Sequence, residues 1–248
     1  MGFTKKKFLK ISTNSKLKKI GFFLKEYITT EKKELLETSK LLIEWLREID
    51  NISLKLPENR YEAGILYHKI LSILNKSVYE DIYPYDDTGK ERKIFEIALI
   101  LDNLRSPHNV GSIIRTSEGL GVKKIILTGI TPRTDNPKVK RVSMNSIVDT
   151  VYIERTEDAV ELMKKDNYKI VAIEKTKKSI PYNNFFIERP CFIFGNEEFG
   201  ISQSILEMSE YIVHIPMYGI KNSLNVSVAT GIIISNYLNL YFKNINNI

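Results

Sequence analysis

The chain has 248 residues, 43% of them hydrophobic and 27% charged, which suffices for one full-sized domain and a smaller one and excludes wholesale disorder. Lysine and arginine exceed aspartate and glutamate by 37 to 30, and the resulting net charge of +7 fits a polyanionic partner without proving one. A single cysteine, Cys191, excludes an intramolecular disulfide and a cysteine-based zinc site.

The N-terminal segment is rich in lysine. Residues 1–25 contain eight lysines and no acidic residue, which suits either a nucleic-acid surface or a solvated terminus, and the two interpretations are equally good. The lysines at positions 5–7 are not followed by the apolar stretch of a secretory signal. No apolar run approaches the roughly 18 residues of a membrane span. We therefore expect a cytoplasmic protein without a membrane partner.

Residues 1–80 show helical periodicity. Thr30 is placed to cap a helix that carries Glu31 and Glu34 in its first turn. The apolar residues of this helix recur on one face, at Leu35, Leu36, Leu42, Ile43, Leu46 and Ile49. A second helix is expected after Pro57, with its apolar positions at Tyr61, Ile65, Ile70, Ile73 and Leu74. Trp45 is expected to be a core residue or a helix contact rather than a base-stacking platform, and the charged, Pro- and Gly-containing stretch 79–93 is expected to form a linker.

Strands and helices alternate from residue 94 onward. Strands are expected at 97–101, 124–127, 148–153, 170–173, 192–194 and 211–215. Helices are expected at 109–120, 157–165, after Ser202, and at 225–242, with a long loop between 127 and 148. This alternation is typical of an α/β domain with a mainly parallel sheet. The sequence thus predicts a helical, basic N-terminal region with its linker, residues 1–93, and an α/β domain, residues 94–248.

Two glycine-rich segments fail as nucleotide-binding motifs. Gly119 and Gly121 follow a helix rather than a strand, and Lys124 occupies the third glycine position of a dinucleotide fingerprint. Residues 195–202 have the two glycines of a P-loop but lack its lysine, and their two acidic residues would repel phosphate. A P-loop ATPase and a dinucleotide enzyme are both excluded.

Three segments of the chain are similar to the motifs of one known enzyme family. Residues 101–116, LDNLRSPHNVGSIIRT, are similar to its first motif, in which an arginine follows an asparagine by six residues. Residues 192–202, FIFGNEEFGIS, are similar to the second, and IPM at 215–217 with SLNVSVA at 223–229 to the third. The three motifs occur in the family's order, so the combined match is far more specific than any one of them. By these motifs the chain resembles the SpoU (TrmH-like) branch of the SPOUT superfamily of RNA ribose 2′-O-methyltransferases.

The resemblance implies an α/β fold whose C-terminal segment forms a deep trefoil knot, a rare exception to ordinary topology. It also implies a cleft for S-adenosylmethionine formed by the knot loops. By position, the donor contacts fall on Gly195, Ile215 and Leu224, with residues Leu127, Thr128 and Gly129 forming a third wall. Glycine at 195 lets backbone approach a ligand closely. Ile215 and Leu224 are equally explained as core residues, and both roles can hold at once.

The resemblance also implies catalytic residues. Arg115 matches the essential arginine, and we expect it to clamp phosphate and lower the pKa of the ribose hydroxyl, because arginine does not deprotonate in proteins. A surface salt bridge to Glu118 is the alternative. Asn109 is able to cap the helix that carries Arg115 and to orient substrate or a partner loop, and a cap alone would explain it. Glu197 is expected to hold the knot loop or Arg115, and Ser223 and Asn225 either bind ligand or are ordinary N-caps.

The predicted reaction is therefore S-adenosylmethionine-dependent methylation of a ribose in structured transfer or ribosomal RNA by a homodimer. The last helix is apolar on more than one face, which favours the dimer, unless the N-terminal helices cover the second stripe within one chain; its apolar residues are Val226, Val228, Ile232, Ile233, Ile234, Tyr237, Leu238 and Tyr241. The RNA surface is expected at Arg133, Lys138, Lys140, Arg141 and the N-terminal lysines. Two alternatives are an inactive RNA-binding protein on the same fold and a base methyltransferase from another SPOUT branch.

Overall fold

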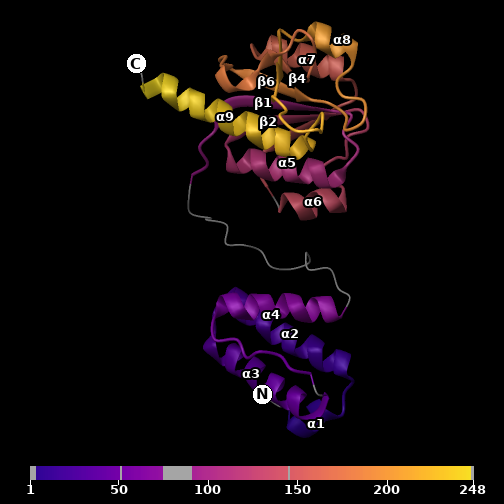
Figure 1. The fold of residues 1–248 in the computed structure, drawn as a ribbon, viewed down its shortest axis with the longest axis vertical. Helices are drawn as coiled ribbons and strands as arrows, with labels where there is room; N and C mark the ends of the chain where they lie inside the picture. The colour runs from indigo at the N-terminus through magenta and orange to yellow at the C-terminus, as the bar shows by residue number, and fades with distance from the viewer. Residues whose placement is uncertain (1–3, 51, 75–90, 145, 247–248) are drawn as a thin grey trace. The chain divides into compact units, whose positions relative to one another are not determined.

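The computed structural model describes residues 4–50, 52–74, 91–144 and 146–246. The chain divides into two compact units, Met1–Thr88 and Gly89–Ile248 (Figure 1), whereas the sequence suggested a division after residue 93. The expected linker, 79–93, lies outside the described residues except for its last three positions. No helix in the described ranges is both long and apolar enough to cross a membrane.

The N-terminal unit contains four described helices, α1 (Lys5–Leu9), α2 (Thr13–Thr30), α3 (Lys33–Asp50) and α4 (Arg60–Ile73). Helix α2 packs against both α3 and α4 (Figure 1). The buried core includes Phe8, Leu17, Ile20, Leu24, Ile43, Leu46 and Ile70. Trp45 lies beside Phe8 with ring centroids 5.8 Å apart, so it is the helix contact that the sequence predicted.

Two sequence predictions for these helices are wrong. Thr30 ends α2 instead of capping the next helix, because Glu31 adopts a left-handed conformation and stops α2 there. In α4, Tyr61 is 77% and Ile65 55% exposed, and of the predicted apolar positions only Ile70 is fully buried. The buried face consists of Ala63, Leu66, Tyr67 and Ile70, which follow the helical spacing of three and four residues.

The C-terminal unit is built on a seven-stranded sheet in the order β3-β2-β1-β6-β4-β7-β5, and every strand pair in it is parallel. The strands are β1 (Phe95–Asp102), β2 (Val122–Thr128), β3 (Asp149–Ile153), β4 (Lys169–Ile173), β5 (Ile180–Pro181), β6 (Pro190–Phe194) and β7 (Tyr211–His214). The predicted α/β class and the parallel sheet are confirmed. Cys191, in β6, is fully buried, as expected for a small apolar side chain.

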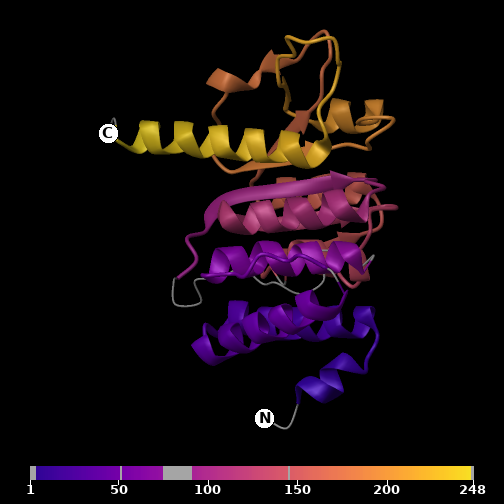
Figure 2. The same cartoon turned by 60° about the horizontal axis from the view of Figure 1, so that its bottom comes forward.

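Helices cover both faces of this sheet. Helices α5 (Pro107–Gly119), α6 (Pro137–Ser143) and α9 (Val226–Asn246) lie on one face, and α7 (Thr156–Lys165) and α8 (Gln203–Met208) on the other (Figures 1 and 2). Central strand β1 is buried on both sides: Leu99 and Leu101 belong to the core under α5 and α9, and Ala98 and Ile100 to the core under α7. The continuous apolar run that predicted β1 is explained by this double burial.

The long loop predicted between residues 127 and 148 contains a helix, α6. Asn136 caps it by accepting a 2.9 Å hydrogen bond from the Lys138 amide, and Pro137 occupies its first turn. The Asn-Pro pair is a standard helix-start signal, so this helix could have been predicted from the sequence. The other addition is the short edge strand β5 with a 3-10 turn at Tyr182–Asn184.

Candidate active site

A chain of side-chain hydrogen bonds joins the three segments singled out in the sequence. These segments leave the carboxyl ends of β1, β6 and β7, where parallel sheets bind ligands. Asn225 donates from Nδ2 to Oδ1 of Asn109 at 3.1 Å, and Asn109 donates from Nδ2 to Oε1 of Glu197 at 2.8 Å. The tertiary structure therefore brings together three of the five residues predicted to be catalytic.

Glu197 anchors the start of α5. Its carboxylate accepts hydrogen bonds from the backbone amides of Arg105, at 2.8 Å, and Ser106, at 3.2 Å, as well as from Asn109. Partial burial opposes ionisation, but these donors outweigh it, so the pKa of Glu197 lies below its ordinary value. An ionised carboxylate that accepts three hydrogen bonds is suited to holding loops. Among the described residues, no hydrogen bond joins it to Arg115.

The first turn of α5 is capped by Ser106, not by Asn109. The Ser106 hydroxyl accepts from the Asn109 amide at 3.3 Å, and Pro107 follows as the first helical residue. Proline at this position fixes the helix start, which makes Asn109 the third helical residue. Its side chain is thus available for Glu197 and Asn225, and the capping alternative is wrong.

Asn225 caps α9 and also bridges to α5. Its Oδ1 accepts from the amide of Ser227 at 2.9 Å, from the Ser227 hydroxyl at 2.6 Å, and from the amide of Val228 at 3.4 Å. Its Nδ2 remains available for Asn109. The structure thus confirms that Asn225 is a cap and adds a bridge between α9 and α5. Ser223, two residues earlier, is exposed.

A cavity of about 680 Å³ lies between the end of β4, the segment after β6 and the segment after β7. This volume is in the range typical of small-molecule sites. Of the predicted residues, the lining includes Gly195, Glu197, Ile215, Ser223, Leu224 and Asn225. Leu224 is 39% exposed, so core packing does not explain it, whereas Ile215 is half-buried and also packs against the core.

Gly195 is required by the tight turn around the cavity. Asn196 and Gly200 form a two-way backbone hydrogen-bonded bridge directly after it, with N–O distances of 3.1 and 2.9 Å. A Cβ atom on Gly195 would lie 2.5 Å from the carbonyl carbon of Gly200 and 2.6 Å from the Ile201 side chain. The sequence predicted that Gly195 lets the backbone approach a ligand closely. The structure adds that the turn itself leaves no room for a side chain at this position.

Strand β4 contributes a residue to the site that was not predicted from the sequence. Glu174, directly after β4, lines the cavity and accepts hydrogen bonds from the amides of Ile201, at 3.3 Å, and Lys175, at 2.9 Å. Gly200 has φ +68°, and a Cβ atom there would lie 2.5 Å from the Glu174 carboxylate. The rule that ligands bind at the carboxyl ends of parallel strands would have pointed to this residue.

Leu127, Thr128 and Gly129 do not form the third wall that was predicted for the donor cleft. Leu127 and Thr128 are buried, and among the described residues neither they nor Gly129 belong to the cavity lining. Thr128 shares a 2.7 Å hydrogen bond with Thr156. Gly129 has φ +56° and lies against Asn103, whose Oδ1 accepts from the amide after it. These residues support the loop after β1.

Arg115 is exposed on α5, outside the cavity lining. The predicted alternative, an ion pair with Glu118, is not formed, and in the part of the chain that the structure describes no residue bonds to this guanidinium. An arginine with its five donors unengaged is available for an external anion.

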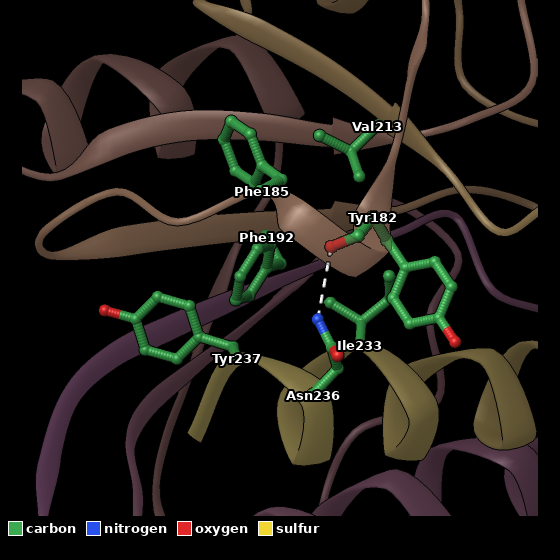
Figure 3. A pocket seen from close by; sticks show the side chains of 7 residues that line it. All are labelled: Tyr182, Phe185, Phe192, Val213, Ile233, Asn236 and Tyr237. Atoms are coloured by element: carbon green, nitrogen blue, oxygen red, sulfur yellow. Dashed lines mark hydrogen bonds between the residues drawn. The ribbon is translucent and has the colours of Figure 1, made fainter. Parts of the chain in front are cut away.

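A second, much smaller cavity of about 10 Å³ lies between α9 and the segment after β5. Figure 3 shows its aromatic lining, including Tyr182, Phe185, Phe192 and Tyr237, and the 3.1 Å hydrogen bond from Asn236 to the Tyr182 carbonyl. A space of this size holds at most one water molecule. It is a packing gap that seats the edge segment on α9.

Comparison with known proteins matches residues 96–235 to the model of the SpoU rRNA Methylase family. Similar sequences include the 23S rRNA (guanosine-2'-O-)-methyltransferase RlmB of Blochmanniella floridana, 33% identical over 57% of this chain and 57% of that protein. Another is the tRNA (guanosine(18)-2'-O)-methyltransferase of Aquifex aeolicus, 31% identical over 58% of this chain and 69% of that protein. The chain thus spans little more than half the length of the first relative.

Two solved structures resemble the C-terminal unit. One is the A. aeolicus TrmH/SpoU tRNA modifying enzyme, with TM-score 0.56, 26% identity, and coverage of 62% of this chain and 79% of that one. The other is the SpoU methyltransferase AviRb from Streptomyces viridochromogenes in complex with AdoMet, with TM-score 0.55, 25% identity, and coverage of 63% and 64%. The first 95 residues lie outside the family match.

Proposed function

The chain belongs to the SpoU rRNA methylase family, and from this we propose that it transfers a methyl group from S-adenosylmethionine to a ribose 2′-hydroxyl of RNA. The observation that carries the proposal is the hydrogen-bonded chain Asn225–Asn109–Glu197 beside the large cavity. The relatives named as 2'-O-methyltransferases of transfer and ribosomal RNA support the same reaction.

The cavity fits a donor of this chemical character. Its lining mixes apolar side chains, such as Ile215 and Leu224, with backbone groups at Gly195 and carboxylates at Glu174 and Glu197. When bound, S-adenosylmethionine supplies a methyl group on a positively charged sulfur. We assign Gly195, Ile215 and Leu224 to holding the donor, with Glu174 keeping the turn after β6 in place. Ser223 and Asn225, at the same cavity, are assigned to positioning the reactants.

Arg115 is assigned to the RNA side of the reaction. A ribose hydroxyl is a poor nucleophile, so positive charge near the adjacent phosphate promotes loss of its proton. The planar guanidinium grips phosphate through two donors, and an arginine does not itself accept a proton. Glu197 is already engaged by three donors, so we place the proton on a substrate phosphate and give Glu197 a positioning role.

We also propose a C-terminal deep trefoil knot and a homodimer with active sites near the seam. Support for the dimer comes from α9, where Val228 is 52% and Phe242 40% exposed. These two residues lie on one helical stripe with the half-buried Ile232. A second subunit that covers the stripe would remove apolar surface from water.

The substrate class is transfer or ribosomal RNA, and the reaction is tested by supplying labelled methyl donor with total RNA stripped of its modifications. Nuclease digestion separates ribose-methylated from base-methylated nucleosides. We expect labelled 2′-O-methylnucleoside from the wild-type protein and none from Arg115→Ala purified in parallel. Label in a base would favour the other SPOUT branch, and RNA binding without any label would favour the inactive protein.

A further inference from the structure

Helix α2 carries an exposed stripe opposite its buried face. The buried face includes Leu17, Ile20, Leu24 and Ile28. The stripe, which we call the α2 stripe, consists of residues at helical spacing: the exposed Asn14, Ser15, Lys18, Phe22 and Thr29 and the half-buried Lys25. None of its members is acidic. It lies in the unit that precedes the family match, so the family resemblance does not account for it.

Phe22 is the unusual member of the α2 stripe. Its side chain is 57% exposed, although three turns of apolar residues on the same helix are buried. Its ring lies 5.4 Å from the ring of Phe23 at an interplanar angle of 80°. An exposed ring one helical turn from the exposed Lys18 offers a flat surface and positive charge together. Single-stranded RNA is bound by surfaces of this composition.

The neighbouring helix α3 has the opposite character. Its exposed stripe follows the same spacing and consists of Glu34, Glu37, Leu41, Glu44 and Glu48. Ion pairs neutralise part of it, since Glu37 contacts Lys40 at 2.8 Å and Glu48 contacts Lys5 at 2.6 Å. Of the two stripes, only the α2 stripe has the sign that attracts phosphate.

We propose that the α2 stripe binds RNA at an unpaired nucleotide, with Phe22 stacked on the base and Lys18 on a flanking phosphate. The choice of RNA as partner rests on the proposed function. Asn14, Ser15 and Thr29 extend the stripe with hydrogen-bonding groups at both ends. Lys18 contributes salt-dependent affinity and the ring contributes a preference for unpaired over paired RNA. An acidic protein segment would use Lys18 but would not require the ring.

The test measures binding of the full chain, without methyl donor, to an unmodified RNA stem-loop and to a blunt RNA duplex of equal length. Phe22→Ala should weaken stem-loop binding by roughly five- to 100-fold, the range found for one base stack. Phe22→Ala should change duplex binding little. Phe22→Tyr, which keeps an aromatic ring, should bind the stem-loop like the wild type. Lys18→Ala should weaken binding of both RNAs. It should also reduce the slope of log affinity against log salt concentration by about one.

The α3 stripe provides matched controls. Leu41, 44% exposed, is the counterpart of Phe22, so Leu41→Ala should bind both RNAs like the wild type. Lys33→Ala removes an exposed lysine at the start of α3 and should leave the salt slope nearly unchanged. Fluorescence of Trp45, the chain's one tryptophan, checks that each variant keeps the N-terminal unit folded.

The result that overturns the inference is stem-loop binding by folded Phe22→Ala and Lys18→Ala equal to that of Leu41→Ala. Equal losses with Phe22→Ala and Phe22→Tyr also overturn it, because the aromatic ring is retained in the second. These readouts are independent of methyl transfer. A wild-type protein that methylates no RNA would refute the proposed function, whereas a methylating protein with an inert α2 stripe would refute only this inference.

Discussion

The side-chain amide of Asn225 donates a 3.1 Å hydrogen bond to the side-chain oxygen of Asn109, which lies 116 positions earlier in the chain. The bond joins the first turns of α9 and α5. Because Asn109 in turn donates to Glu197, the segment after β6 is tied to the same point. Three segments that the sequence separates widely are thus fixed to one another next to the cavity.

Substitution can separate the two contacts of Asn225, which are its hydrogen bond to Asn109 and its cap at the start of α9. Asn225→Asp keeps the oxygen that caps α9 but loses the donor to Asn109, so we expect nearly unchanged stability and a clear loss of methyl transfer. Asn225→Ala removes both and should also lower the free energy of unfolding by about 1 kcal/mol. Chemical denaturation and steady-state kinetics measure the two effects. Wild-type activity in Asn225→Asp would show that the bridge has no role in the reaction.

Arg115→Ala is expected to reduce methyl transfer by roughly 100-fold or more while donor affinity stays nearly constant, since the residue acts on the RNA phosphate. Arg115→Lys should also be poor, because a point charge does not reproduce the two-pronged donor set. Calorimetric titration with S-adenosylmethionine measures the first step alone. A large loss of donor affinity in Arg115→Ala would place the residue in the donor pocket instead.

Gly195→Ala should damage the turn that borders the cavity. The added Cβ would meet the Gly200 backbone at 2.5 Å, and overpacking of this kind costs about 1–3 kcal/mol. We expect weaker donor binding and a lower melting temperature. Gly219→Ala, in the segment after β7, is the control, because a Cβ there meets no atom within 4 Å. Equal donor affinity in the two variants would contradict the assignment of Gly195.

Asp50 gives the N-terminal unit a predictable response to acid. Hydrogen bonds from Lys16, at 2.8 Å, and Thr13, at 2.7 Å, hold the pKa of Asp50 below its ordinary value of 3.8. A lowered carboxyl pKa stabilises the folded state fully above pH 3.8, and this stabilisation is lost as the pH falls through the lowered value. Unfolding monitored by Trp45 fluorescence should therefore show a decline in stability below about pH 3.8 that is smaller in Asp50→Asn.

At neutral pH, Asp50→Asn should destabilise the same unit by about 3 kcal/mol, because the Lys16 side chain is only 4% exposed and loses its counter-charge. Glu37→Gln is the control on the same helix. The Glu37 side chain is 68% exposed, so its ion pair with Lys40 should contribute under about 1 kcal/mol. Equal effects of the two substitutions would argue against a structural role for the buried pair.

The proposed homodimer predicts a mass twice that of the chain in light scattering at micromolar concentration. Val228→Glu, on the exposed stripe of α9, should shift the protein toward monomer because it places a charge in the apolar seam. Ser204→Glu, on the exposed side of α8 at the other sheet face, should leave the mass unchanged. A monomeric wild-type protein would refute the dimer.

The sequence by itself determined most of the C-terminal unit. The apolar run 97–101 predicted a strand buried on both faces, and β1 is one, because local composition and burial agree there. The three motifs that indicated the family are likewise local patterns. For α4 the same reasoning failed: Tyr61 and Ile65 are apolar yet exposed, since the face a helix buries depends on the position of its neighbours.

Only the tertiary structure decided which hydrogen bonds the candidate site residues make and which segments they join. The sequence left Asn109 and Asn225 open between cap and site residue. Pro107 next to Ser106 makes Ser106 the cap of α5 instead of Asn109, and the approach of α9 to α5 lets the cap Asn225 also bridge to Asn109. The same holds for Glu174, which enters the site because β4 lies between β6 and β7 in the sheet. Hydrogen bonds depend on distances between atoms, and distances between remote segments are set by packing of the whole sheet.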